Sequence, residues 1–331
     1  EGLIFGLSTH RAENAWFYNG GMKFPSDVQD STISLYGRRY DNEKYTEDFA
    51  REWLTHTYEL INKYEPKLIW FDWTVNNPVL MPYFNKFMAY YYNNALDWGK
   101  NVVVNTKYGY PTNVQVWDIE RGKSGKMMQF PWQTDTSVGK KSWSYIDGEE
   151  NKSPEQIVHD LIDIVSKNGN LLLNIGPRAD GTITDEQKAV LLSIGKWLKV
   201  NGEAIYDTYK WKQSEQWSEG DRNWKDKGKH YVGGNSILKQ TVDPDPGFAV
   251  KEAFFTAKNN AVYAILPKFP ENQVILKDIR TSSKTKITLL GYDKTLKWKQ
   301  NGNNIVIEIP TIPYSKVPCQ YAWTLKLEYV E

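Results

Sequence analysis

Two carboxylates follow apolar segments in the first part of the chain, where they could serve nucleophilic or acid–base chemistry. Asp72 follows Leu-Ile-Trp-Phe, and Glu120 follows Val-Gln-Val-Trp-Asp-Ile. Such a pair is the minimum for cleaving a glycosidic bond, because one carboxylate attacks the anomeric carbon while the other protonates the departing oxygen. The simpler readings are that Asp72 caps a turn or helix and that Glu120 pairs with Arg121 at a strand end.

The segments that carry these carboxylates alternate between strands and helices. Apolar runs predict strands at residues 3–9, 67–72, 101–106, 114–120, 127–130 and 170–175. An amphipathic stripe predicts a helix at 46–64, and capping signals at Ser153 and Thr184 begin two more helices, each stopped by Asn-Gly. This alternation predicts a parallel (β/α)8-like (TIM) barrel, in which catalytic groups lie at the carboxyl ends of the strands.

The character of the sequence changes after about residue 211. Runs of β type at 261–266, 273–276, 286–290, 304–309 and 322–327 are separated by turn signals such as Asn301-Gly302. We therefore expect an antiparallel β-sandwich at 212–331, after a catalytic barrel portion at 1–211. A complete barrel takes roughly 250 residues, so this α/β barrel is expected to be N-terminally incomplete.

Composition excludes several classes of partner and cofactor. The 331 residues carry a net charge of +1, which gives no basic field for nucleic acid and no polybasic membrane patch, and no apolar run approaches a membrane span. The single cysteine, Cys319, and four scattered histidines offer no metal motif. The 14 Trp and 21 Tyr suit either sugar rings or ordinary packing, and composition does not decide between the two.

Several motifs, in order, are similar to a known enzyme family. They are residues 169–177 (Gly-Asn-Leu-Leu-Leu-Asn-Ile-Gly-Pro), Asp180-Gly181, residues 195–206 (Gly-Lys-Trp-Leu-Lys-Val-Asn-Gly-Glu-Ala-Ile-Tyr), 269–272 and 284–291. Together they resemble family 29 of the glycoside hydrolases, the α-L-fucosidases, over essentially the whole chain. The resemblance implies a barrel followed by a sandwich, no metal or organic cofactor, and a secreted or periplasmic location.

The resemblance also implies roles for individual residues. Asp72 stands where family members have the nucleophile of a Trp-x-Asp motif, and Trp70 would line the fucose pocket. Glu120 best matches the general acid/base. Lys107 stands where relatives often have Arg, and Trp143 where an aromatic residue packs against fucose.

Three departures from the family pattern bear on the site. Gln133 replaces a glutamate that relatives often have, and an amide cannot transfer the catalytic proton, which favours Glu120. His10 replaces a Tyr-rich strand end, and it either bonds a fucose hydroxyl or is a solvated rim histidine. The family's early strands, with other fucose contacts, are expected upstream of this chain, so an N-terminal fragment is a candidate partner that completes the barrel.

The resemblance thus implies a retaining exo-glycosidase that releases α-L-fucose from a fucosylated oligosaccharide or glycoconjugate. Two alternatives remain at this point. One is a catalytically silent fucosidase remnant or sugar-binding protein, and the other is a retaining glycosidase of different specificity, such as an α-galactosidase.

Overall fold

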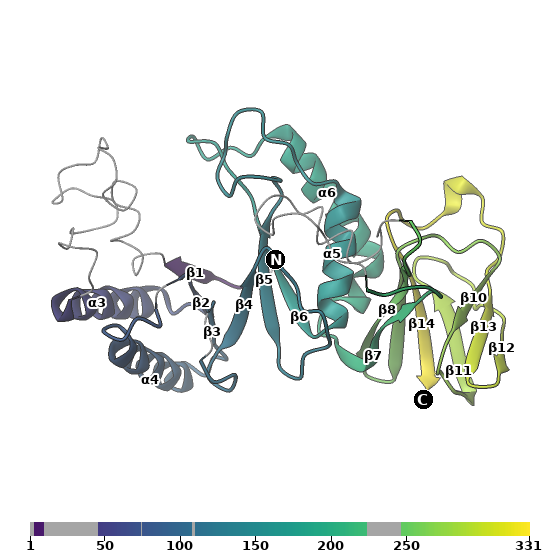
Figure 1. Ribbon diagram of the computed structural model, residues 1–331, viewed down its shortest axis with the longest axis horizontal. Helices are drawn as coiled ribbons and strands as arrows, with labels where there is room; N and C mark the ends of the chain where they lie inside the picture. The colour runs from purple at the N-terminus through teal and green to yellow at the C-terminus, as the bar shows by residue number, and fades with distance from the viewer. Residues whose placement is uncertain (1–2, 10–45, 74, 108–109, 224–245) are drawn as a thin grey trace. The chain divides into compact units, whose positions relative to one another are not determined.

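The computed structural model describes residues 3–9, 46–73, 75–107, 110–223 and 246–331 (Figure 1). Six strands form one sheet in the order β1-β2-β3-β4-β5-β6. The strands are β1 (Gly6–Thr9), β2 (Leu68–Phe71), β3 (Val103–Thr106), β4 (Val116–Glu120), β5 (Trp132–Ser137) and β6 (Gly169–Asn174). The helices are α3 (Glu47–Tyr64), α4 (Met81–Asp97), α5 (Pro154–Ser166) and α6 (Asp185–Asn201).

The strand order confirms the predicted parallel α/β architecture. Consecutive strands are neighbours, as in a barrel wall, and the described residues supply six strands where a closed barrel has eight. The chain divides into two compact units, Glu1–Asp118 and Ile119–Glu331. None of the helices in the described ranges is long and apolar enough to cross a membrane.

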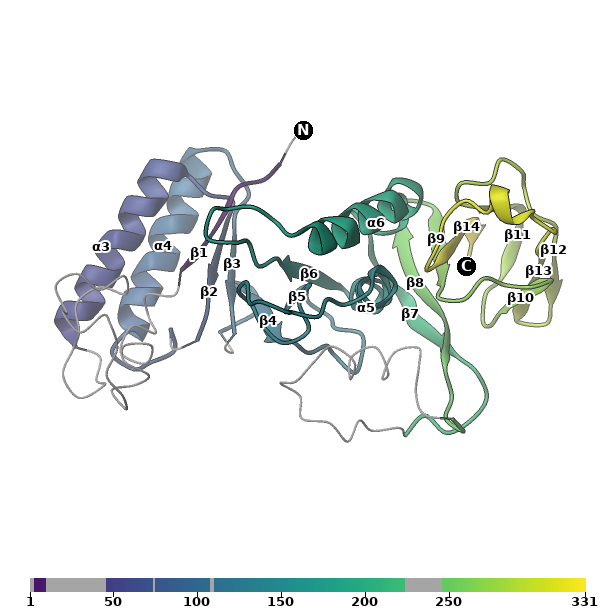
Figure 2. The same cartoon turned by 90° about the horizontal axis from the view of Figure 1, so that it is seen from above.

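In the first unit, α3 and α4 lie side by side along one side of β1–β3 (Figure 2). The Thr46 hydroxyl caps α3 by accepting a hydrogen bond from the Phe49 amide at 3.2 Å. An aromatic cluster then joins the helices to β2, since the Trp53 ring lies 5.8 Å from Phe71 and 6.2 Å from Phe84. Phe71 therefore points toward the helices, and strand alternation directs its two neighbours in sequence to the opposite face.

In the second unit, both predicted helix starts are present. Ser153 and Gln156 form the full capping box of α5, and the Thr184 hydroxyl accepts from the Gln187 amide at 3.3 Å at the start of α6. The Gln187 side chain accepts instead from the Gly176 amide at 3.2 Å, so the second capping box is only half formed. It thereby ties α6 to the loop after β6.

The C-terminal part forms two antiparallel sheets, in the orders β11-β14-β9-β8-β7 and β10-β13-β12. Their strands are β7 (Tyr209–Trp217), β8 (Lys251–Lys258), β9 (Ala261–Leu266), β10 (Gln273–Leu276), β11 (Thr281–Leu289), β12 (Trp298–Asn301), β13 (Asn304–Glu308) and β14 (Trp323–Val330). Apolar residues from both sheets share one core. This confirms the predicted sandwich.

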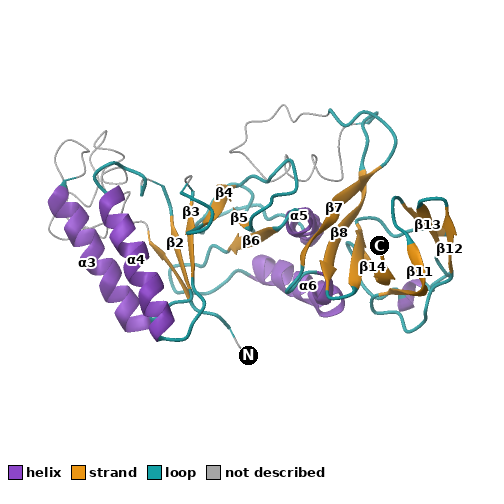
Figure 3. Ribbon diagram, turned by 90° about the horizontal axis from the view of Figure 1, so that it is seen from below, coloured by secondary structure: helices purple, strands orange, loops and turns teal. Residues whose placement is uncertain are grey.

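The five-stranded sheet of the sandwich is apolar on both faces. Along β9, Val262 and Ala264 join the core between the two sheets, whereas Tyr263 and Ile265 join a core made with α5 and α6. Figure 3 shows both helices beside β7 and β8. The Trp197 indole of α6 donates to the carbonyl of Ala322 at 2.8 Å, so polar bonds also tie the helix to this domain.

Two features of the barrel portion differ from the sequence expectation. The predicted strand at 127–130 is wrong, because the strand at this place is β5, a polar segment buried along its whole length. Its polar groups find partners inside the protein, as when the Thr134 hydroxyl donates to the carbonyl of Ile119 at 2.7 Å. Helix α4 was not predicted, since Leu80 at its N-cap makes no side-chain capping bond.

Candidate active site

The register of the sheet places three charged residues side by side. Strands β2, β3 and β4 are parallel, and their last paired row includes Phe71 of β2. Asp72, Lys107 and Asp118 each follow that row by one position on their own strand. Since Phe71 faces α3 and α4, these three side chains emerge on the other face. Asp72 and Lys107 come directly after the ends of β2 and β3, and Asp118 is the middle residue of β4. Catalytic groups occupy the carboxyl ends of the strands in barrel enzymes.

Lys107 lies between the two carboxylates. Its Nζ atom is 3.2 Å from Asp118 Oδ2 and 3.9 Å from Asp72 Oδ1. The Trp70 indole donates to the same Asp118 oxygen at 3.1 Å, and the ammonium lies 5.1 Å from the Trp70 ring centroid and 5.7 Å from that of Trp73. We call these five residues the strand-end cluster.

Exposure distinguishes the three charged members of the strand-end cluster. The Asp72 side chain is 14% exposed, whereas those of Lys107 and Asp118 are 2% and 0% exposed. Of these three charged residues, Asp72 is therefore the one that a solvent-borne substrate reaches first. Its neighbours supply a buried ammonium and a fixed indole.

In the second unit, Glu120 is the last residue of β4, and an unusual backbone conformation follows it. Arg121 has a φ of +45°, a left-handed value that a non-glycine residue adopts rarely. Its amide donates to the Asp135 carbonyl at 2.9 Å and its guanidinium to the Ser137 hydroxyl at 3.0 Å. The guanidinium carbon also lies 3.9 Å from the Trp143 ring centroid, so it stacks on that ring.

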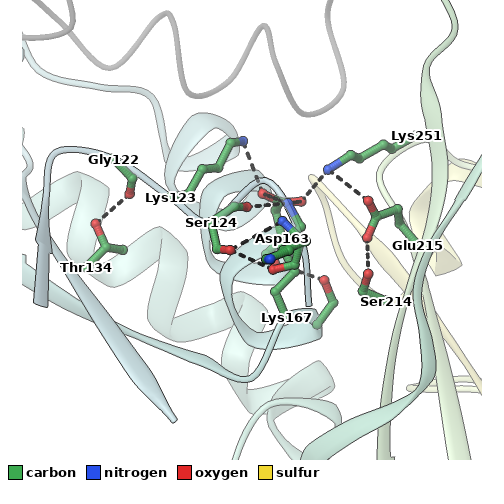
Figure 4. A network of polar contacts seen from close by, with 11 residues as sticks. Gly122, Lys123, Ser124, Thr134, Asp163, Lys167, Ser214, Glu215 and Lys251 are labelled. Atoms are coloured by element: carbon green, nitrogen blue, oxygen red, sulfur yellow. Dashed lines mark hydrogen bonds and ion pairs between the residues drawn. The ribbon is translucent and has the colours of Figure 1, made fainter. Parts of the chain in front are cut away.

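A different cluster of buried charges lies in the second unit (Figure 4). Three lysines converge on Asp163 of α5: Lys123 at 3.1 Å, Lys167 at 3.1 Å and Lys251 at 2.7 Å. Lys251 comes from β8 and also lies 3.5 Å from Glu215 of β7. We call these five residues the lysine cluster. It links helix α5 to the five-stranded sheet.

The pKa values in and beside the lysine cluster follow from burial and charge. Burial would raise the pKa of Asp163, but Lys123, Lys167 and Lys251 outweigh it and hold that pKa well below its usual range. Burial lowers the pKa of Lys167 to about 8. Nearby Asp160, fully buried, has its pKa raised by burial to about 7, although Lys123 opposes the shift.

The structure brings together some of the predicted site residues and leaves one outside the described ranges. Trp70, Asp72 and Lys107 share the strand-end cluster, while Glu120 and Trp143 belong to the second unit. His10 lies outside the described residues. Within the ranges that the structure describes, no group of three or more His, Cys, Asp or Glu side chains is suited to hold a metal ion.

Sequence reasoning assigned no role in the site to two residues that the geometry makes prominent. Asp118 contacts both Trp70 and Lys107, and Arg121 contacts Trp143. The signal for Asp118 was its place in the predicted strand, two residues before Glu120 and hence on the same strand face. Arg121 gave no comparable signal, because its left-handed conformation is not encoded by a glycine or asparagine.

Comparison with known proteins identifies the family. The sequence model of the α-L-fucosidase family matches residues 1–203, and that of the α-L-fucosidase C-terminal domain matches residues 248–328. Tissue α-L-fucosidase of Mus musculus is 32% identical over 296 residues, which cover 86% of this chain and 58% of the mouse protein. Plasma α-L-fucosidase of Homo sapiens is 30% identical over 342 residues, covering 99% of this chain and 62% of the human protein.

A solved structure agrees with this assignment. The crystal structure of Thermotoga maritima α-fucosidase has a TM-score of 0.63 and 26% sequence identity, covering 88% of this chain and 60% of that enzyme. The chain thus spans about 60% of the length of these relatives. Since a family model matches more than half of its residues and a second one matches its sandwich, the chain belongs to the α-L-fucosidase family.

Proposed function

We propose that this protein releases α-L-fucose from fucosylated oligosaccharides or glycoconjugates with retention of anomeric configuration. The observation that carries the proposal is the position of Asp72. It follows the end of β2 inside the segment matched by the family, is the most exposed charged member of the strand-end cluster, and has the Lys107 ammonium 3.9 Å away. The alternatives of a silent remnant, a sugar-binding protein or an α-galactosidase become outcomes of the test below.

The proposed reaction has two displacements. An Asp72 oxygen attacks the anomeric carbon of fucose while the glycosidic C–O bond breaks, and Glu120 gives its proton to the leaving oxygen. This step forms a fucosyl ester of Asp72. Glu120 then takes a proton from water, whose oxygen attacks the anomeric carbon and releases Asp72. Two inversions at the same carbon give net retention.

We further propose that three residues bind the sugar. Trp70 lies on the same strand face as Asp72, where its indole can line the pocket. Lys107 is placed to donate a hydrogen bond to a fucose hydroxyl near Asp72. Trp143, stacked on Arg121, offers a ring held in one orientation for an apolar face of the sugar.

Structures of the Thermotoga maritima enzyme support the substrate class. One holds fucose, and another holds a mechanism-based inhibitor. Both are findings about that enzyme, which is 26% identical to this chain. The proposed substrate of this protein is the same sugar in an α-glycosidic linkage.

Covalent trapping tests the nucleophile. The protein is incubated with a 2-fluorofucosyl fluoride. The fluorine at C2 disfavours the oxocarbenium-like transition states, while the good anomeric leaving group still allows the first step, so the glycosyl-enzyme accumulates. The anomeric fluoride leaves, and we expect one 2-fluorofucosyl label, on the peptide that contains Asp72. A label on another carboxylate would refute the assignment of Asp72.

Turnover tests the activity and the specificity. We expect hydrolysis of an aryl α-fucoside and much slower hydrolysis of an aryl α-galactoside, which carries a 6-hydroxyl where fucose has a methyl group. Preference for the galactoside would favour the α-galactosidase alternative. Absence of turnover with both, together with measurable fucose binding, would favour a sugar-binding protein.

A further inference from the structure

Asp118 is a completely buried carboxylate to which the proposed mechanism gives no task. One oxygen, Oδ2, accepts from the Trp70 indole at 3.1 Å and lies 3.2 Å from the Lys107 ammonium. A buried carboxylate is tolerated when charge and hydrogen bonds compensate its lost hydration, and here both partners are residues of the proposed sugar site. From β4, Asp118 thus contacts Trp70 of β2 and Lys107, which follows β3, and both of these residues lie beside Asp72.

We propose that Asp118 is a positioning residue for the fucosidase reaction: it holds the Lys107 ammonium away from Asp72 and fixes the Trp70 indole beside it. The inference rests on the proposed function, since it assumes that Asp72 is the attacking group. It assigns Asp118 no contact with the sugar and no proton transfer.

The two distances around Lys107 carry the argument. The ammonium is at hydrogen-bond range from Asp118, at 3.2 Å, and beyond that range from Asp72, at 3.9 Å. A direct bond to Asp72 would stabilise its full negative charge in the ground state more than its partly neutralised form in the transition state, which slows attack. By drawing Lys107 to itself, Asp118 keeps the ammonium from bonding directly to the Asp72 carboxylate.

The contact with Trp70 extends the same role to the sugar pocket. Trp70 and Asp72 are two residues apart on the same strand, so their side chains leave the same face. The bond to Asp118 fixes the rotation of the indole, which an apolar contact would leave free. Loss of this bond should therefore affect sugar binding, while loss of the Asp118 charge should affect the rate of attack.

Two variants separate these effects. Asp118→Asn keeps the size of the side chain and an oxygen that accepts from Trp70, but removes the charge. We expect kcat for an aryl α-fucoside to fall by about 10- to 100-fold with KM nearly unchanged. Asp118→Leu removes both functions, and we expect the same fall in kcat together with a rise in KM.

A double-mutant cycle tests whether Asp118 acts through Lys107. If it does, the double variant Lys107→Met/Asp118→Asn should be no slower than Lys107→Met alone, because the ammonium to be held is already gone. Fully multiplicative losses of kcat would overturn the proposal. If Asp118→Asn alone folds poorly, the comparison of Lys107→Met with the double variant can still be made, because the double variant buries no ammonium opposite the new amide.

A matched control excludes a general loss of packing. Asp163 is also completely buried and paired with lysine, so Asp163→Asn likewise removes a fully buried carboxylate charge, but outside the proposed site. We expect it to lower the thermal midpoint but to leave kcat per folded molecule unchanged. An equal loss of kcat in both aspartate variants would overturn the positioning role.

The outcomes for the two proposals are distinct. Failure of the unsubstituted chain to hydrolyse the fucoside contradicts the proposed function. Turnover by that chain, with Asp118→Asn equally fast, contradicts the role of Asp118 alone.

Discussion

The strand-end cluster places two carboxylates, Asp72 and Asp118, around one lysine, whereas the lysine cluster places three lysines around Asp163. In the first, one carboxylate side chain is 14% exposed. In the second, the side chains of Asp163 and its three lysines are at most 5% exposed. The two clusters therefore use buried charge differently: the strand-end cluster holds an acid at the solvent boundary, and the lysine cluster joins helix α5 to the five-stranded sheet.

The largest effect is expected from Asp72→Asn, which tests whether the exposed acid of the strand-end cluster is the chemical group. An amide cannot form the glycosyl ester, so we expect kcat to fall by roughly 10^4-fold. The thermal midpoint should change little, because Lys107 keeps its contact with Asp118. Kinetics with an aryl α-fucoside and a thermal melt measure both. A large loss of stability with retained turnover would reverse the roles of the two clusters.

Next comes Asp163→Asn, which removes the acid at the centre of the lysine cluster. Three buried ammonium groups would then lack this partner, so we expect the free energy of unfolding to fall by about 3–5 kcal/mol. Urea titration followed by tryptophan fluorescence measures it. A change below about 1 kcal/mol would show that the lysine cluster does not brace α5.

A matched pair of lysine substitutions sharpens the comparison further. Lys107→Met takes away an ammonium shared by two carboxylates, and we expect it to cost about 3 kcal/mol of stability. Lys123→Met leaves Lys167 and Lys251 on Asp163, and should cost no more than about 1 kcal/mol because burial of the lysine is also relieved. Urea midpoints rank the two. Equal costs would mean that the ratio of acids to lysines does not matter.

The smallest effect concerns Asp160, whose pKa burial raises to about 7. The pKa of an aspartate in the unfolded chain is about 3.9, so between pH 3.9 and 7 the folded state binds the Asp160 proton more tightly than the unfolded state does. The stability of the wild type therefore decreases as the pH rises through that window. Asp160→Asn lacks the ionisation. We therefore compare the thermal midpoint of the variant with that of the wild type at two pH values. The difference, variant minus wild type, should be about 2–4 °C larger at pH 8 than at pH 5. A pH-independent difference would contradict the raised pKa.

Local signals in the sequence were sufficient for most of the fold. The apolar stripe at 46–64, the capping signals at Ser153 and Thr184 and the apolar runs of the parallel strands predicted elements that the structure contains. Strand β5 escaped prediction because it is polar and buried, so its stability depends on hydrogen bonds to distant residues such as Ile119. Periodicity does not reveal such partners.

The candidate site was accessible to sequence reasoning only in part. A carboxylate that ends an apolar strand, such as Asp72, is visible as a pattern. The contact between Asp118 and Trp70 depends on the register of β2 and β4, which are both paired to β3. Register arises from tertiary pairing, so a residue whose importance lies in its cross-strand partners is recognised only when the sheet is known.

The two apolar faces of the five-stranded sheet limit how this domain can be exchanged between relatives. Tyr263 and Ile265 of β9 pack with α5 and α6, which the family comparison assigns to the preceding domain, whose match ends at residue 203. A hybrid between two relatives joined near that boundary would set one parent's helices against the other parent's sheet. The two packing surfaces would no longer be complementary, so such a hybrid should lose stability unless α5, α6 and β9 are exchanged together.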